Sequence, residues 1–309
     1  MQALLDVIVP VFLVIGAGYA AVWARLITNT TIDGLMQFTQ GVAIPCLLFR
    51  ALWTLDLGQN FDPWLLLAFY SGSVTGFVVG VLGAHYLFHR DAEDCVAIGF
   101  CCLFANSLML GLALTERAYG SDALGPNYII VALHSPVCYG IGITAMETLR
   151  ARGSDPKRLP VTVLKAMFRN NLIVGIVLGL VFNVTSISLP SPMTDALDMV
   201  IRTALPVALF AMGGVLCRYR PEGDTRVIAF ICLVSLGMHP AITYTLGHTV
   251  NLSDGALRSA VVTAAMAPGI NAYVFANMYG RARRVAASSV LVAPGLSTLT
   301  AWLWLSALP

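Results

Sequence analysis

Two long hydrophobic stretches of this chain are each interrupted by residues that can break a helix or bind a polar group. The first contains Ala105-Asn106-Ser107, and the second contains Ala267-Pro268-Gly269-Ile270-Asn271. Proline removes a backbone donor from a helix, so an unwound stretch would leave a half-helix N-terminus whose partial positive charge suits an anion. The asparagine amides can then hydrogen-bond the solute. We predict a solute-binding site formed by Asn106, Ser107, Pro268, Gly269 and Asn271.

The same residue types also have a structural interpretation. Asn, Ser and Gly in membrane helices often mediate close helix packing. For a single asparagine we would prefer packing, but here two asparagines lie in corresponding segments of two halves, which favours binding. The first segment contains no proline, so its interruption would have to depend on asparagine and glycine.

A second pair of motifs indicates an internal repeat. Ile44-Pro45-Cys46-Leu47-Leu48-Phe49 and Leu205-Pro206-Val207-Ala208-Leu209-Phe210 align their Pro, Leu and Phe at one offset (206 − 45 = 161). Paired, helix-breaking segments in two halves are typical of secondary transporters, in which the substrate binds near the repeat interface. Pro45 and Pro206 therefore either line the site or only kink their helices, and the sequence leaves both interpretations open.

The composition predicts a membrane protein. Hydrophobic residues make up 58% of the chain and charged residues 11%, against roughly 45–50% and about 25% in soluble domains. A net charge of +2 gives no reason to expect a nucleic-acid partner. A helix that crosses a bilayer needs about 20 mostly apolar residues, which predicts an all-α fold of ten transmembrane helices. The predicted spans lie near residues 4–24, 33–52, 63–88, 93–114, 126–149, 166–184, 194–216, 226–247, 256–278 and 285–308.

The basic residues predict how these spans are oriented. Most of the 18 Lys and Arg residues fall in alternate loops, with the largest group between Arg150 and Arg169. Because positively charged loops stay in the cytoplasm, both termini are expected outside. Five spans in each half is an odd number, so the halves must have opposite orientation. We expect a first repeat over residues 1–149, a cytoplasmic connecting loop over 150–165, and an inverted second repeat over 166–309.

Few ionisable residues lie inside the predicted spans. His134 and His239 can each carry a coupled proton, or each can be a neutral histidine bonded to a backbone carbonyl. Asp198 and Arg202 lie four residues apart, which predicts an ion pair on one helix face. The sequence has no mid-membrane pair of carboxylates, and its seven cysteines have no metal-binding spacing. We therefore expect no metal site and no catalytic residues.

Six motifs, in order along the whole chain, resemble those of the auxin efflux carrier family, specifically its bacterial branch of malonate and malate permease-like proteins. They are Val42-Ala43-Ile44-Pro45-Cys46-Leu47-Leu48-Phe49-Arg50, Phe104-Ala105-Asn106-Ser107 with Gly111, Arg169-Asn170-Asn171-Leu172, Leu205-Pro206-Val207-Ala208-Leu209-Phe210-Ala211-Met212-Gly213, His239-Pro240, and Ala267-Pro268-Gly269-Ile270-Asn271-Ala272-Tyr273 with Tyr279-Gly280. Three positions depart from the family pattern. Ala113 and Asn171 stand where proline is common, and Ala293-Pro294 stands where a small hydroxyl residue is common.

The resemblance implies a ten-helix fold similar to that of sodium/bile-acid symporters. A scaffold of spans 1, 2, 6 and 7, which includes Pro45 and Pro206, would face a transport part made of spans 3–5 and 8–10. Spans four and nine would be broken and crossed, and Asn106 and Asn271 would hold a carboxylate beside the breaker Pro268. The transport part would move like an elevator, and a homodimer through the scaffold is expected because related folds often dimerise there.

These features predict a secondary transporter in the cytoplasmic (inner) membrane, in contact with the lipid bilayer. Its substrate would be a small mono- or dicarboxylate such as malonate or malate. Transport would be coupled to H⁺, to Na⁺ or to neither, with no other cofactor. A solute-sensing receptor on the same fold is the first alternative. A membrane-embedded enzyme would need a convergent nucleophile, metal or acid/base set, which the sequence lacks, so we expect that the protein is not an enzyme.

Overall fold

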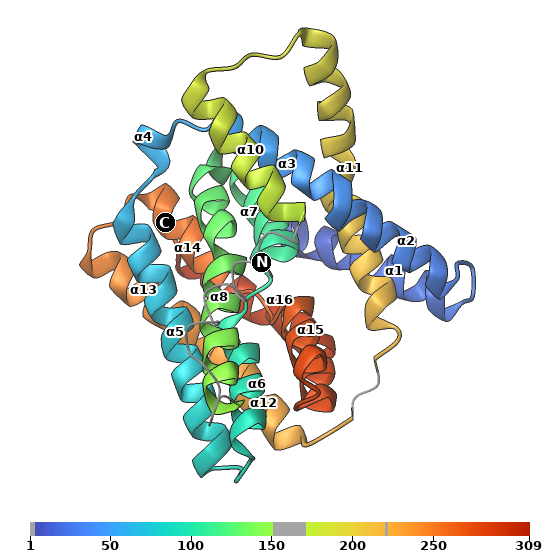
Figure 1. Cartoon of the computed structure of the whole chain (residues 1–309), viewed down its shortest axis with the longest axis vertical. Coiled ribbons are helices and arrows are strands. Elements are labelled where there is room, and N and C mark those ends of the chain that lie inside the picture. Colours follow the sequence, from blue (N-terminus) through green and yellow to red (C-terminus); the bar gives the residue numbers. More distant parts are fainter. Residues whose placement is uncertain (1–3, 151–170, 220–221) are drawn as a thin grey trace. The chain divides into compact units, whose positions relative to one another are not determined.

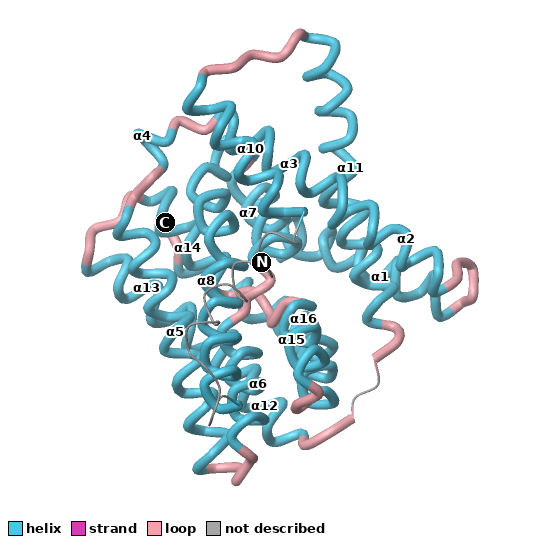
Figure 2. The backbone as a smooth tube through the Cα atoms, in the orientation of Figure 1, coloured by secondary structure: helices cyan, strands magenta, loops and turns pink. Residues whose placement is uncertain are grey.

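The fold was analysed in a computed structural model, which describes residues 4–150, 171–219 and 222–309. In these ranges the chain forms helices, loops and one isolated two-residue bridge (Figure 2). Seven of the described helices are long and apolar enough to cross a membrane: Asp6–Trp23, Asn29–Thr54, Pro63–Tyr86, Ser121–Arg150, Ser191–Leu216, Thr225–Thr249 and Arg283–Ala307. Most of the predicted connecting loop 150–165, and the start of the predicted span 166–184, lie outside the described residues.

The seven long helices coincide with seven of the predicted spans. The other three predicted spans, near 93–114, 166–184 and 256–278, contain shorter helices. Two of the three are interrupted near their middle. The third holds α10 (Asn171–Thr185), which begins where the described residues resume after 170.

Contacts along the chain define two compact units (Figure 1), and each unit combines segments from both halves of the sequence. The larger unit comprises Met1–Val9, Asp62–Val163 and Tyr219–Pro309, and the smaller unit comprises Pro10–Phe61 and Leu164–Arg218.

The smaller unit is built from helices that pack in pairs. Its elements are most of α1 (Val9–Trp23), α2 (Asn29–Phe38), η2 (Thr39–Ala43), α3 (Ile44–Thr54), the short α4 (Leu57–Asn60), α10 and α11 (Ser191–Leu216). Of these, α2, η2 and α3 form one continuous helix. Helix α10 packs against α3, and α11 packs against α2.

Two glycines let helices of the smaller unit approach each other to backbone contact. A Cβ atom added to Gly18 of α1 would collide with the carbonyl oxygen of Phe210 in α11. A Cβ added to Gly179 of α10 would lie 2.7 Å from the carbonyl oxygen of Phe49 in α3. Small residues at such crossings allow the close packing that stabilises helix pairs in membranes.

The prolines Pro45 and Pro206 do not end their helices, contrary to the helix-breaking interpretation of these motifs. Pro45 follows the π-helical turn η2, in which the Ile44 N–H donates to the Thr39 carbonyl five residues back. The wide turn accommodates the ring that would clash in a regular α-helix. Pro206 lies inside the continuous helix α11.

The end of α3 is capped by a side chain from a neighbouring helix. Asn183 of α10 donates through Nδ2 to the carbonyl oxygens of Leu52, Trp53 and Leu55, at 2.9, 3.0 and 2.7 Å. The last carbonyls of a helix have no partner within the helix. The Asn183 amide supplies one and joins α10 to α3.

Asp198 forms its ion pair with Arg50 of α3, at 3.3 Å, and the prediction of a pair with Arg202 is wrong. The Arg50 guanidinium also lies over the Trp53 ring, 5.0 Å from its centroid. Arg202 lies four positions along the same helix as Asp198, whereas Arg50 lies on a helix that packs beside it. Only the tertiary structure reveals that Arg50 is a neighbour of Asp198.

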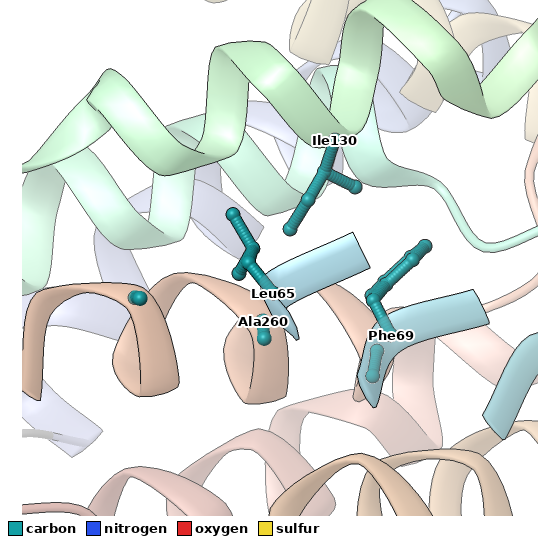
Figure 3. Packing of buried hydrophobic residues seen from close by; sticks show 6 residues of the cluster. Leu65, Phe69, Ile130 and Ala260 are labelled. Atoms are coloured by element: carbon teal, nitrogen blue, oxygen red, sulfur yellow. The ribbon is translucent and has the colours of Figure 1, made fainter. Parts of the chain in front are cut away.

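The larger unit contains the remaining elements. They are η1 (Leu4–Ile8), α5 (Pro63–Tyr86), α6 (Ala92–Leu103), η3 (Ser107–Gly111), α7 (Leu112–Tyr119), η4 (Ser121–Leu124), α8 (Gly125–Arg150), α12 (Thr225–Leu233), η6 (Val234–Met238), α13 (His239–Thr249), α14 (Asp254–Ala264), α15 (Ile270–Tyr279) and α16 (Arg283–Ala307). Leu65, Ile130 and Ala260 face one another in a buried cluster that joins α5, α8 and α14 (Figure 3).

Charged residues join three helix ends at one end of this unit. Glu93 of α6 accepts hydrogen bonds from Arg150 at the end of α8, at 2.8 Å, and from Arg281 after α15, at 2.9 Å. The hydrogen bond to Glu93 and its charge raise the pKa of Arg281. Tyr279 donates to Glu147 at 3.0 Å. These contacts join α6 and α15 to the long helix α8. Helix α6 precedes the first interruption of the predicted spans, and α15 follows the second.

Candidate functional site

The first interruption lies between α6 and η3. Helix α6 ends at Leu103, Phe104 is extended, and helical structure resumes at Ser107. Asn106 caps the new helix, because its Oδ1 accepts a hydrogen bond from the Met109 N–H at 3.3 Å. Asparagine is among the best residues at such a cap. An amide side chain therefore takes part in a break that contains no proline.

The second interruption lies between α14 and α15. Helix α14 ends at Ala264, and α15 starts at Ile270 after the extended residue Gly269. Pro268 lies in this gap and has no N–H to donate. The gap is fully enclosed, since residues from Ala265 to Gly269 are buried.

The two interruptions meet in an antiparallel bridge between Ala105 and Pro268. The Asn106 N–H donates to the Ala267 carbonyl at 2.8 Å, and the Gly269 N–H donates to the Phe104 carbonyl at 3.0 Å. We call this arrangement the crossover. It brings four of the predicted site residues together: Asn106, Ser107, Pro268 and Gly269.

The fifth predicted residue, Asn271, lies three positions beyond Pro268 of the bridge, in the first turn of α15. Asn271 is partly exposed, whereas Asn106 is buried, with 7% of the residue exposed. The bridge itself consists of backbone atoms, so it leaves both side chains available for other contacts.

Side chains from neighbouring helices satisfy the carbonyls that the first break releases. Ser73 of α5 donates to the Leu103 carbonyl at 2.8 Å. The Nε2 atom of His134, in α8, lies 3.1 Å from the Ala105 carbonyl. Buried carbonyls without partners would be costly in a membrane. Ser73 and His134 thus help to stabilise the interrupted backbone between α6 and η3.

The two buried histidines both contact backbone carbonyls. His239, the first residue of α13, places Nε2 3.3 Å from the Phe69 carbonyl. The Phe69 ring lies between the histidines, with its centroid 5.5 Å from His134 and 5.1 Å from His239. The Cys138 Sγ is also 3.6 Å from the His134 Nδ1. This is the geometry of the carbonyl-bonded alternative, and proton coupling stays a prediction.

The buried part of the described structure carries little charge. Its buried polar residues are Asn, Ser, Thr and His, and none is Asp, Glu, Lys or Arg. No three described His, Cys, Asp or Glu side chains are grouped so that they could hold a metal ion. Hydrogen bonding and helix dipoles are therefore the means by which the described crossover can attract a ligand.

Sequence reasoning missed the buried residues Ser73, Phe69 and Asn127. Each lies in a segment without a motif, and each matters through contacts with residues more than ten positions away in the sequence. Pro45 and Pro206, predicted to face the site, both belong to the smaller unit.

The long apolar helices of the described structure define a multi-pass membrane protein. The sequence profile of the family described as "Membrane transport protein" matches residues 3–305. The chain therefore belongs to this family, the auxin efflux carrier family, as the motifs predicted.

A protein of Rhizobium meliloti (strain 1021) named "Putative malonate transporter" is similar over nearly the full length. It is 23% identical over 305 residues, which cover 97% of this chain and 94% of that protein.

Proposed function

We propose that this protein is a secondary transporter that moves a small organic anion, a mono- or dicarboxylate such as malonate or malate, across the membrane. The observation that carries the proposal is the crossover, where two interrupted helices meet through the Asn106–Ala267 and Phe104–Gly269 hydrogen bonds. Broken helices of this kind hold the substrate in many secondary transporters.

The charge pattern favours an anion. Helical structure starts at Ser107 and again at Ile270, directly beside the bridge, so two helix N-termini with partial positive charge lie there. The described buried residues provide no carboxylate that would repel the substrate or attract a cation. Asn106 and Asn271 are placed to add hydrogen bonds and to orient the ligand.

The substrate class has a second source of support. The relative from Rhizobium meliloti carries the name of a malonate transporter, and malonate has two carboxylates that could each face one helix N-terminus. At 23% identity the relative supports a class of substrate rather than one compound.

We further propose that the halves form inverted five-helix repeats with ten spans. Helix pairs recur at nearly constant spacing: α1 and α10 end at Trp23 and Thr185, which are 162 apart (185 − 23), and Asn29–Thr54 and Ser191–Leu216 both have 26 residues and are 162 apart (191 − 29). The Gly18–Phe210 contact becomes the Gly179–Phe49 contact when each residue is shifted by 161 (179 − 18 and 210 − 49). Such exchange of partners is what a two-fold axis between repeats produces.

The crossover fits the same symmetry. Ala105 and Pro268 are 163 residues apart (268 − 105), close to the repeat offset, and they pair in antiparallel direction. Residues related by a two-fold axis meet only near that axis. The positions of the basic residues support an orientation in the inner membrane with both termini outside.

The two units support an elevator mechanism. The smaller unit holds spans 1, 2, 6 and 7, and the larger holds the segments of spans 3–5 and 8–10. We propose that the smaller unit is the scaffold, with Pro45 and Pro206 facing the site and a homodimer formed through it. The larger unit would carry the substrate. Coupling to H⁺, through His134 or His239, or to Na⁺ is part of the proposal.

The test is uptake of labelled malonate by proteoliposomes that contain the purified protein, with mono- and dicarboxylates as competitors. We expect saturable uptake above that of empty liposomes, with inhibition by unlabelled dicarboxylates. Stabilisation of the protein by malonate without any flux would instead support the solute-sensing receptor. Neither stabilisation nor flux with any carboxylate would contradict the proposed substrate class.

A further inference from the structure

Asn127 is a fully buried amide that contacts two other helices. It lies in the first turn of α8, and its Nδ2 donates to Thr115 Oγ1 in α7 at 3.2 Å and to Thr263 Oγ1 in α14 at 2.9 Å. Both threonines are fully buried as well. Helix α14 packs against both α7 and α8 within the larger unit (Figure 1).

The two partners of Asn127 belong to the two interrupted helices. Thr115 lies on α7, the continuation of the helix that Asn106 caps. Thr263 lies in the last turn of α14, four residues before Ala267, whose carbonyl accepts from the Asn106 N–H. A single amide therefore joins one half of each broken helix.

Thr263 also lies close to η3, the turn that follows the first break, because α14 packs against η3. A Cβ added to Gly111 would lie 3.5 Å from Thr263 Oγ1 and 3.6 Å from the Asn106 carbonyl oxygen. Thr263 thus lies where α14 packs against the turn that Asn106 caps.

Among the described residues, the Asn127 side chain forms hydrogen bonds only through its Nδ2 donor group. Asn127 Oδ1 is buried and has no hydrogen-bond partner among the described residues. An apolar residue of similar shape would avoid the cost of this unpartnered oxygen. What an apolar residue could not supply is the pair of directional N–H bonds to the two threonines.

We propose that Asn127 is a positioning residue of the crossover. Its two hydrogen bonds fix α7 relative to α14, and so fix the register in which Asn106 and Gly269 bond across the bridge. This inference rests on the proposed function in that the crossover binds the substrate. Asn127 acts on the substrate only through the crossover.

The test compares three variants with the wild type. Asn127→Leu removes the donors and leaves two buried hydroxyls unpaired. Adding Thr115→Val and Thr263→Val to Asn127→Leu makes the cluster apolar, which restores complementary packing without the directional bonds. Ser259→Ala is the matched control, because Ser259 is a buried hydroxyl on α14 that bonds to Ala123 and not to α7.

We expect Asn127→Leu to lower the Tm and to raise the KM for malonate. The triple variant should regain most of the Tm, yet its KM should stay raised by about fivefold or more, the effect of one typical hydrogen bond. Hydrogen exchange of the Asn106 and Gly269 amides should be about tenfold faster in the triple variant. Ser259→Ala should keep the wild-type KM and exchange rates.

A triple variant with wild-type KM and wild-type exchange at both amides would overturn the proposal, since Asn127 would then only fill space. Absence of malonate transport by the wild type would instead count against the proposed function. The exchange rates of the two amides would still decide the role of Asn127 in that case.

Discussion

Replacing Gly18 with alanine is expected to lower the stability of the protein more than any other single methyl group added to α1. The added Cβ would collide with the carbonyl oxygen of Phe210, a backbone atom that cannot rotate away. Overpacking of this kind costs about 3 kcal/mol. For a chain of this size that corresponds to a fall in Tm of roughly 4–6 °C.

Gly16 provides the matched control on the same helix. A Cβ added there meets nothing within 4 Å, and the residue is exposed. Gly16→Ala should leave the Tm unchanged or raise it, since alanine is the better helix former by roughly 0.5–1 kcal/mol. Thermal unfolding of both variants at one scan rate measures the difference. Equal Tm values for Gly18→Ala and Gly16→Ala would contradict the close approach of α1 and α11.

The isosteric change Asn106→Asp is expected to abolish transport while the protein stays folded. The aspartate keeps an oxygen that can cap η3 through the Met109 N–H, whereas Asn106→Ala would also lose the cap, at a cost of about 0.5–2 kcal/mol. The new negative charge would repel a carboxylate bound at the crossover. Two like charges about 4 Å apart repel by about 4 kcal/mol at a partly buried site. We therefore expect Vmax/KM for malonate to fall on the order of 100-fold or more at pH 8.

Asn277→Asp is the control for this change. Asn277 lies on α15 but is exposed and nine positions beyond Pro268 of the bridge (277 − 268), so the same substitution should alter Vmax/KM little. If Asn106→Asp took up malonate at the wild-type rate, with equal protein in the liposomes, the result would contradict substrate binding at the crossover.

The sequence was sufficient to predict the long helices and the place of the crossover. Seven predicted spans coincide with long apolar helices because hydrophobic length is a local property that the bilayer thickness determines. The breaks at Asn106 and Pro268 were also predictable, since both residues act on the backbone beside them.

The contacts that hold the site together were not predictable in this way. Asp198 pairs with Arg50 rather than with Arg202, because a neighbour in space offers a better geometry than a neighbour on the same helix. The helix through Pro45 continues, since a π-helical turn accommodates the proline. Asn183 and Asn127 each act through residues on other helices. Their roles depend on packing, which no local pattern encodes.

The most direct test of the central claim is whether malonate shields the crossover. Ser107 is buried directly beside the bridge, and Ser107→Cys would place a thiol there. Alkylation of that thiol in proteoliposomes can be followed by mass spectrometry of its peptide, with the native Cys217, partly exposed at the end of α11, as the internal reference. We predict that malonate slows alkylation at position 107 several-fold and leaves Cys217 unaffected. Equal rates with and without malonate, in a variant that still transports it, would contradict binding at the crossover.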